Sequence, residues 1–247
     1  MKKLVYLFLL ITQAFFAQSG FEAGNSLYKK GQYQQAIDAY DAVLASKKQS
    51  AELYFNIGNC YYKLNKVAPA IYNYEKALVI SPNNQDVLNN LKFAQKRTVD
   101  EVKVIPKVGF EKLLRDFTAI YDYDKWAWLA IVFSALFLVG FIGYYFSAAS
   151  VLKRVFFVSM FLMLIFVLIS VSAAMFEKNY AVNERPAIVF ADKTEVKSEP
   201  QNKSSKVIDL HEGTKVYVKK VEGRWKKVQL TDGTEGWIES EAIREVK

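Results

Sequence analysis

The stretch that decides the fold class is 126-WAWLAIVFSALFLVGFIGYYF-146, followed eight residues later by 155-VFFVSMFLMLIFVLISVSAAMF-176. These runs hold 21 and 22 residues without a charge, and the only charged residues between them are Lys153 and Arg154. An α-helix rises about 1.5 Å per residue, so each run reaches roughly 31–33 Å and matches the ~30 Å hydrocarbon layer of a bilayer. The sequence therefore predicts two transmembrane helices, 126–146 and 155–176, joined as a hairpin.

The connection 147–154 indicates how this hairpin is oriented. Its Lys153-Arg154 pair favours the cytoplasmic side, because cationic residues in short loops resist translocation. Both flanking regions then lie on the opposite, periplasmic side of a bacterial inner membrane. The N-terminus agrees with this topology, since residues 1–17 combine two lysines, a short apolar core and a final alanine, as an export signal does. Cleavage after Ala17 is expected, and an uncleaved anchor is the alternative.

Composition excludes several classes of function. The chain has 247 residues, of which 52% are apolar, with one cysteine, Cys60, and one histidine, His211. No disulfide within the chain and no His/Cys metal site can be built from these, and no catalytic motif is present, so we expect no enzyme, no cofactor and no metal. His211 is expected in a solvated turn. Cys60 is expected to be a small buried residue, with a redox role as the alternative.

The net charge of +8 does not indicate a nucleic-acid-binding surface. Half of it lies in residues 1–17 and 126–176, where membrane topology favours lysine and arginine. The remaining parts are close to balanced and show no clustered basic stripe, so no nucleic-acid partner is expected.

Residues 18–97 repeat with a period of 34. Gly24-Asn25, Tyr28, Ala36-Ile37 and Tyr40 are echoed by Gly58-Asn59, Tyr62, Ala70-Ile71 and Tyr74. This pattern resembles the tetratricopeptide repeat, which implies an all-α domain of paired helices. A third first-helix, starting at Pro82, is expected to cap the second repeat.

The resemblance also implies where partners bind. In tetratricopeptide repeats the first helix of each pair lines a groove for peptides or partner helices. The partner-binding residues are therefore expected to be Asn25, Tyr28, Lys29, Phe55, Asn56, Asn59, Tyr62 and Lys63, with core packing as the alternative for the two tyrosines and the asparagines. Tyr54, Tyr61 and Tyr74 are instead expected to fill the space between helices.

Residues 98–125 link the repeats to the first span. After Pro106, apolar residues recur at helical spacing with Lys112 and Arg115 opposite them. This predicts a juxtamembrane amphipathic helix, which either lies on the membrane surface or packs against the repeat domain.

A second soluble module is predicted at 187–247, after a linker at 177–186. Alternating apolar residues and the turn Asp232-Gly233 predict five short strands that close into a small all-β barrel. The segment resembles a bacterial SH3-like domain, with Gly236-Trp237 as its most telling part. Trp225 and Trp237 could form a ligand surface, and core packing is the alternative reading of both.

The whole chain thus reads as a multi-domain membrane protein: repeats, a two-helix hairpin and an SH3-like barrel. This order of parts resembles the BatE-like family of Bacteroides-aerotolerance operons. The resemblance implies a periplasmic scaffold for protein–protein interaction in an aerotolerance or oxidative-stress complex. The implied partners are membrane proteins of the von Willebrand type and a MoxR-type ATPase. The alternative is a sensor whose barrel binds peptidoglycan peptides.

Overall fold

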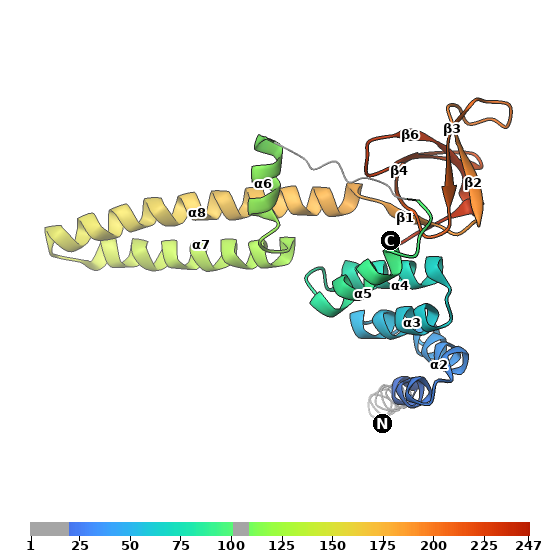
Figure 1. The fold of residues 1–247 in the computed structure, drawn as a ribbon. Coiled ribbons are helices and arrows are strands. Elements are labelled where there is room, and N and C mark those ends of the chain that lie inside the picture. Colours follow the sequence, from blue (N-terminus) through green and yellow to red (C-terminus); the bar gives the residue numbers. More distant parts are fainter. Residues whose placement is uncertain (1–19, 101–108) are drawn as a thin grey trace, which may run out of the picture. The chain divides into compact units, whose positions relative to one another are not determined.

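The structure, a computed structural model, describes residues 20–100 and 109–247 (Figure 1). The predicted signal peptide, residues 1–17, lies outside the described residues. The chain divides into two compact units. One comprises the chain up to Ile105 together with Arg185–Lys247, and the other comprises Pro106–Glu184.

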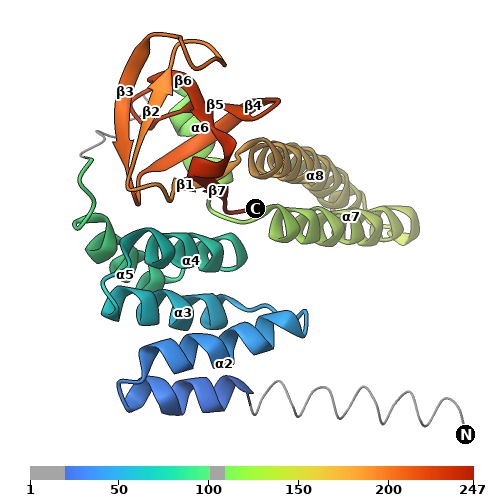
Figure 2. The ribbon, with the colours of Figure 1, turned by 90° about the vertical axis from the view of Figure 1, so that its right-hand side faces the viewer.

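The first unit begins with antiparallel helices that stack in chain order (Figure 2). Residues 20–29 are helical, and the helices that follow are α2 (Tyr33–Ala45), α3 (Ala51–Lys63), α4 (Val67–Ile80) and α5 (Gln85–Gln95). The predicted repeats are therefore present as helix pairs. The last helix begins later than the expected Pro82, because the Asn84 side chain accepts the backbone N–H groups of Asp86 and Val87 and caps α5 at that point.

Small residues set how closely each pair packs. A Cβ atom on Gly58 would lie 2.6 Å from the ring of Tyr74, and Gly24 faces Tyr40 in the same way one repeat earlier. Ala70 and Ala36 are completely buried. The 34-residue repetition in the sequence thus corresponds to repeated contacts between a glycine on a first helix and a tyrosine on the second.

The barrel in this unit is one antiparallel sheet with the strand order β3-β2-β6-β5-β4-β1-β7. Its strands are β1 (Pro186–Val189), β2 (Lys193–Lys197), β3 (Lys206–His211), β4 (Lys215–Glu222), β5 (Trp225–Gln229), β6 (Glu235–Glu239) and β7 (Ile243–Glu245). The expected count of five strands was wrong for the described chain. Two strands have weak sequence signals: all four residues of β1 are buried and do not alternate, and β7 has only three residues.

The packing at Gly236 explains why the barrel needs glycine there. A Cβ atom at this position would overlap Val196 and lie 2.8 Å from the carbonyl oxygen of Lys197. Strands β2 and β6 pair at Lys197 and Trp237, next to this contact. The glycine therefore allows the two strands to approach.

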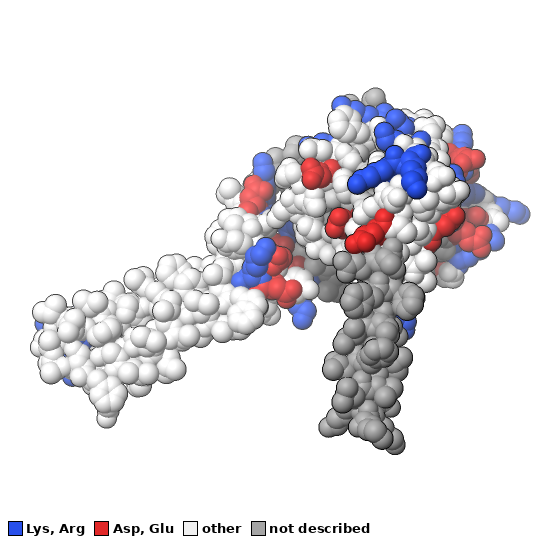
Figure 3. Space-filling model, turned by 90° about the horizontal axis from the view of Figure 1, so that it is seen from below, with Lys and Arg blue, Asp and Glu red and all other residues white. Residues whose placement is uncertain are grey.

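The second unit consists of α6 (Phe110–Thr118), α7 (Tyr123–Phe146) and α8 (Ser150–Asn183). Helix α7 and the part Ser150–Ala181 of α8 are long and apolar enough to cross a membrane, and only 6% of each apolar window is buried. Figure 3 shows the surface of this hairpin almost entirely without charge. The helices meet closely where a Cβ on Gly143 would lie 2.7 Å from the Phe156 ring.

The second long helix extends beyond the predicted span 155–176 at both ends. Helix α8 begins at Ser150, within the expected loop 147–154, and continues to Asn183, through most of the expected linker 177–186. No glycine or proline interrupts the chain between Ser150 and Pro186, so the helix can continue through these residues. A residue that precedes proline disfavours the helical region, which explains why α8 ends just before Arg185-Pro186.

Polar and aromatic contacts join helix α6 to the C-terminal part of α8 and to the first turn of α7. Arg115 forms an ion pair of 2.6 Å with Glu177 and stacks 3.7 Å from the ring centre of Tyr180. The Trp126 indole N–H donates to the carbonyl oxygen of Thr118 at 2.8 Å. Phe110 remains 78% exposed, so the apolar face predicted for this helix is not covered within its own unit.

We predict that Gly58→Ala destabilises the helix pair α3/α4 by about 1–3 kcal/mol, because the added methyl group must displace the Tyr74 ring or the backbone of α3. Amide hydrogen exchange of α3 and α4 in the full chain measures this loss directly. Asn89→Ala on the exposed side of α5 is the matched control and should change the exchange little. Unchanged protection in Gly58→Ala would contradict the close-contact explanation.

Candidate functional site

The expected partner-binding face is organised by asparagines. The Oδ1 atom of Asn25 accepts hydrogen bonds from the Tyr40 hydroxyl at 2.6 Å and from Asn56 Nδ2 at 3.0 Å. The same arrangement recurs 34 residues later, where Asn59 Oδ1 accepts from the Tyr74 hydroxyl and from Asn90 Nδ2, both at 2.8 Å. These bonds join successive first helices and fix the asparagine side chains in place.

The aromatic and basic residues of this face are more varied. Phe55 is half-buried against Tyr74, with ring centres 6.0 Å apart. Tyr28 contacts Tyr33 edge to face at 5.3 Å, and Tyr62 lies under the Arg97 guanidinium, 4.0 Å from its ring centre. Arg97 is therefore a cation at this face that the site prediction missed.

Lys29 and Lys63 are exposed. The structure thus pairs the predicted Asn25 with Asn56, and it pairs Asn59 with Asn90, which the site prediction did not include. It leaves the two lysines open to solvent. Of the tyrosines expected in the core, Tyr74 is fully buried and Tyr54 is 5% exposed, while Tyr61 is half-buried.

The two barrel tryptophans are largely enclosed. Trp225 is 5% exposed and Trp237 is 9% exposed. Arg224 lies 5.6 Å from the ring centre of Trp225, and Lys220 lies 5.8 Å from that of Trp237. Both rings therefore contribute mainly to packing, and little of either indole is accessible to a ligand.

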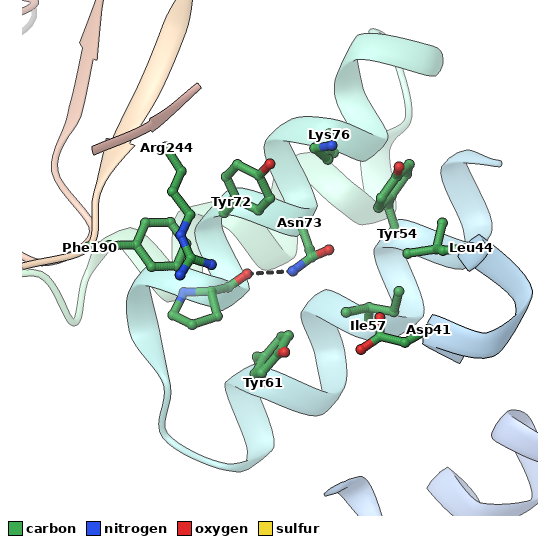
Figure 4. Close-up of a pocket in the computed structure, with 11 residues that line it drawn as sticks. Asp41, Leu44, Tyr54, Ile57, Tyr61, Tyr72, Asn73, Lys76, Phe190 and Arg244 are labelled. Atoms are coloured by element: carbon green, nitrogen blue, oxygen red, sulfur yellow. Dashed lines mark hydrogen bonds between the residues drawn. The ribbon is translucent and has the colours of Figure 1, made fainter. Parts of the chain in front are cut away.

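A cavity of about 230 Å³ lies on the side of the repeats where the second helices pack, next to the barrel (Figure 4). None of the eight predicted groove residues lines it. Its lining comes from α2, α3 and α4 and from the barrel, and consists of Asp41, Leu44, Tyr54, Ile57, Tyr61, Pro69, Tyr72, Asn73, Lys76, Phe190 and Arg244. The sequence pattern missed this site because Phe190 and Arg244 are more than a hundred residues away from the helical residues they face.

The wall between repeats and barrel is built from polar and aromatic contacts. Lys215 on β4 forms an ion pair of 2.8 Å with Glu75 on α4, whose side chain is only 8% exposed. Tyr72 and Phe190 meet edge to face, with ring centres 5.6 Å apart. These contacts hold the barrel against α4 and so define one side of the cavity.

The expectation that His211 lies free in solvent was wrong. His211 ends β3, and its backbone N–H donates to Asp100 Oδ2 at 2.6 Å, while its Nδ1 lies 2.7 Å from Asp100 Oδ1. The Thr214 hydroxyl also donates to Asp100 Oδ2, at 2.6 Å. Burial raises the pKa of Asp100, but the hydrogen bonds from Thr214 and His211 outweigh it, and the net pKa is lowered.

Comparisons with known proteins agree with both modules. Residues 21–85 match the tetratricopeptide repeat family, and residues 192–245 match the bacterial SH3 domain family. The chain is 29% identical over 70 residues to human tetratricopeptide repeat protein 16, and 35% identical over 75 residues to rat sperm-associated antigen 1. These matches cover 28% and 30% of this chain but only 8% of each relative. The chain therefore contains tetratricopeptide repeats and a bacterial SH3 domain, both of which are modules for binding proteins or peptides.

We predict that Cys60 does not react with maleimides in the folded chain near neutral pH. The thiol is completely buried, and burial raises its pKa to about 12, whereas the thiolate is the reactive form. Mass spectrometry should show label only after denaturation. Lys219→Cys places a thiol on an exposed strand and is the control that must label at once. Equal labelling rates for the two thiols would contradict the buried position.

We predict that Asp100→Asn weakens the unit mainly above about pH 4. A carboxylate with a lowered pKa stabilises the folded state above its unfolded pKa of 3.8, and this contribution is lost as the pH falls through the folded pKa. The midpoint of thermal unfolding, followed by tryptophan fluorescence, should be lower than that of the wild type at pH 7 and equal to it in acid. Asp192→Asn, an exposed carboxylate, should match the wild type throughout, and a constant difference for Asp100→Asn would refute this linkage.

Proposed function

We propose that this protein is a membrane-anchored scaffold whose repeats and barrel recruit other proteins on the periplasmic side of the inner membrane. Its place would be in an aerotolerance or stress-related membrane complex. The observation that carries the proposal is the combination of two peptide-binding modules in one compact unit with a helical hairpin whose surface is almost entirely uncharged.

The hairpin supports the anchor. Large apolar residues cover α7 and α8, among them Leu138 at 57%, Phe161 at 56% and Leu168 at 60% exposure. Removing one such side chain from water is favourable by about 1.5–3 kcal/mol. Transfer of a hairpin with this surface from water into lipid is therefore strongly favourable. No charged side chain interrupts α7 beyond its first turn.

The repeat face supports the recruiting role. Its asparagines are fixed by hydrogen bonds, which lowers the entropy lost when a partner binds. Lys29 and Lys63 are exposed at corresponding positions of the two repeats and favour an acidic partner surface. Tethering such a face to a membrane raises the local concentration of any second bound protein. The von Willebrand-type proteins and the MoxR-type ATPase are the proposed partners.

The alternative, a cell-wall sensor, would use Trp225 and Trp237 as its ligand surface. Their rings are 5% and 9% exposed, so the sensor has less support than the scaffold.

Chemical crosslinking in native membranes, followed by mass spectrometry, tests the recruiting role. The double variant Lys29→Glu and Lys63→Glu should lose the crosslinked partners while keeping its membrane content, because the exposed face then repels an acidic surface. Lys219→Glu on the barrel is the control with the same charge change. Identical partner sets in all three chains would overturn the proposed recruiting face.

We predict the topology from single introduced cysteines in a Cys60→Ala background. A maleimide that cannot cross the inner membrane should label Lys30→Cys in the repeats and Lys219→Cys in the barrel when the outer membrane is permeabilised. Ala148→Cys, between α7 and α8, should label only after the inner membrane is opened, because the adjacent cations keep that connection cytoplasmic. Labelling of Ala148→Cys together with the other two would refute this orientation.

A further inference from the structure

Two basic side chains that line the cavity between the repeats and the barrel have no acidic partner among the described residues. Lys76 and Arg244 line it, and among the described residues neither forms an ion pair with a carboxylate. Asp41 is the single acidic residue of the lining, and Figure 4 places it at the end away from Arg244 and Phe190. The lining therefore has two basic side chains, Arg244 and Lys76, against one acidic side chain, and it carries a net positive charge.

The aromatic rings around the cavity are already engaged by the chain's own cations. Lys76 lies 5.2 Å from the ring centre of Tyr54 and 5.3 Å from that of Tyr72. Arg244 lies 4.1 Å from the ring centre of Phe190. An aromatic cage for a cationic ligand needs free ring faces, so this lining disfavours a cation and favours an anion beside Arg244 and Lys76.

The size of the cavity limits what can enter. Its volume of about 230 Å³ is below that of pockets for drug-sized ligands, roughly 300–1,000 Å³, whereas an apolar cavity of about 150 Å³ holds benzene. A volume of this size accommodates one aromatic side chain, and Leu44, Ile57 and Tyr61 contribute apolar atoms to the lining. Asp41 and Arg244 are exposed, so the cavity opens to solvent at its charged ends, where neighbouring residues of an inserted segment would lie.

We propose that this cavity binds a segment of a partner protein that inserts one aromatic side chain and places an adjacent Asp or Glu carboxylate on Arg244 and Lys76. This deepens the proposed function, on which it rests in taking the occupant to be a protein. It adds a second recognition site, separate from the first-helix face and built jointly by both modules. Because β7 and the segment after β1 supply Arg244 and Phe190, neither the repeats nor the barrel alone would contain the complete site.

The test mixes the full chain in detergent with one of three blocked dipeptides: acetyl-Phe-Glu-amide, acetyl-Phe-Gln-amide or acetyl-Ala-Glu-amide. NMR line broadening of the dipeptide side-chain protons measures binding. The Phe-Glu probe should bind at least tenfold more tightly than either of the others, because it alone has both the ring and the charge. Equal binding of Phe-Glu and Phe-Gln would overturn the proposal, since the micelle or an apolar surface would then account for it.

Variants locate the site. Arg244→Gln and Lys76→Gln should each remove the preference for Glu over Gln, and Asp41→Asn should tighten binding of the Phe-Glu probe by relieving repulsion. Lys219→Gln removes an exposed cation that is not part of the lining and should leave the preference for Glu unchanged. The midpoint of thermal unfolding should be the same in all four variants as in the wild type. A preference that survives in both Arg244→Gln and Lys76→Gln would refute the site. The probes need no cellular partner, so this result is independent of the crosslinking experiment.

Discussion

One hydrophobic core joins the repeats to the barrel, and the rest of the first unit depends on it. Ile71 and Ala70 on α4 are completely buried, and Ile188 and Val246 of the barrel belong to the same cluster. A core of this kind gains about 25 cal/mol for each Å² of apolar surface removed from water. Helix α4 therefore has packed neighbours on several sides, which is unusual for the outer helix of a repeat. Its polar residues follow from that position, since Glu75 is buried only because Lys215 is there to pair with it.

Much of this architecture could be predicted from local sequence patterns. The period of 34 identified the helix pairs because the same close contact between a glycine and a tyrosine recurs in each repeat. Gly24 meets Tyr40 in the first repeat, and Gly58 meets Tyr74 in the second. The uncharged runs located the hairpin because two apolar runs of this length, separated by eight residues, predict two long adjacent helices. Gly236-Trp237 marked the barrel because only glycine allows the strands to approach at that point. In each case the constraint acts within a few residues or at a fixed spacing.

The parts that could not be predicted depend on contacts between distant segments. Asp100 and His211 are separated by 111 positions, and no pattern in either segment indicates that they meet. The cavity has the same origin, because Phe190 and Arg244 reach residues of α4 only after both modules have folded. Helix ends were missed for a different reason: polar residues such as Lys178 continue a helix as readily as they begin a loop, and only Pro186 stops it.

The position of Cys60 has a consequence if the repeats lie in the periplasm, as proposed above. It is the single sulfhydryl in the sequence and has no accessible surface once α3 packs. In a compartment where thiols are oxidised, a folded copy therefore has no thiol available for a mixed disulfide, while an unfolded copy exposes one. Folding of the repeat domain therefore prevents the single cysteine from forming a disulfide with another molecule.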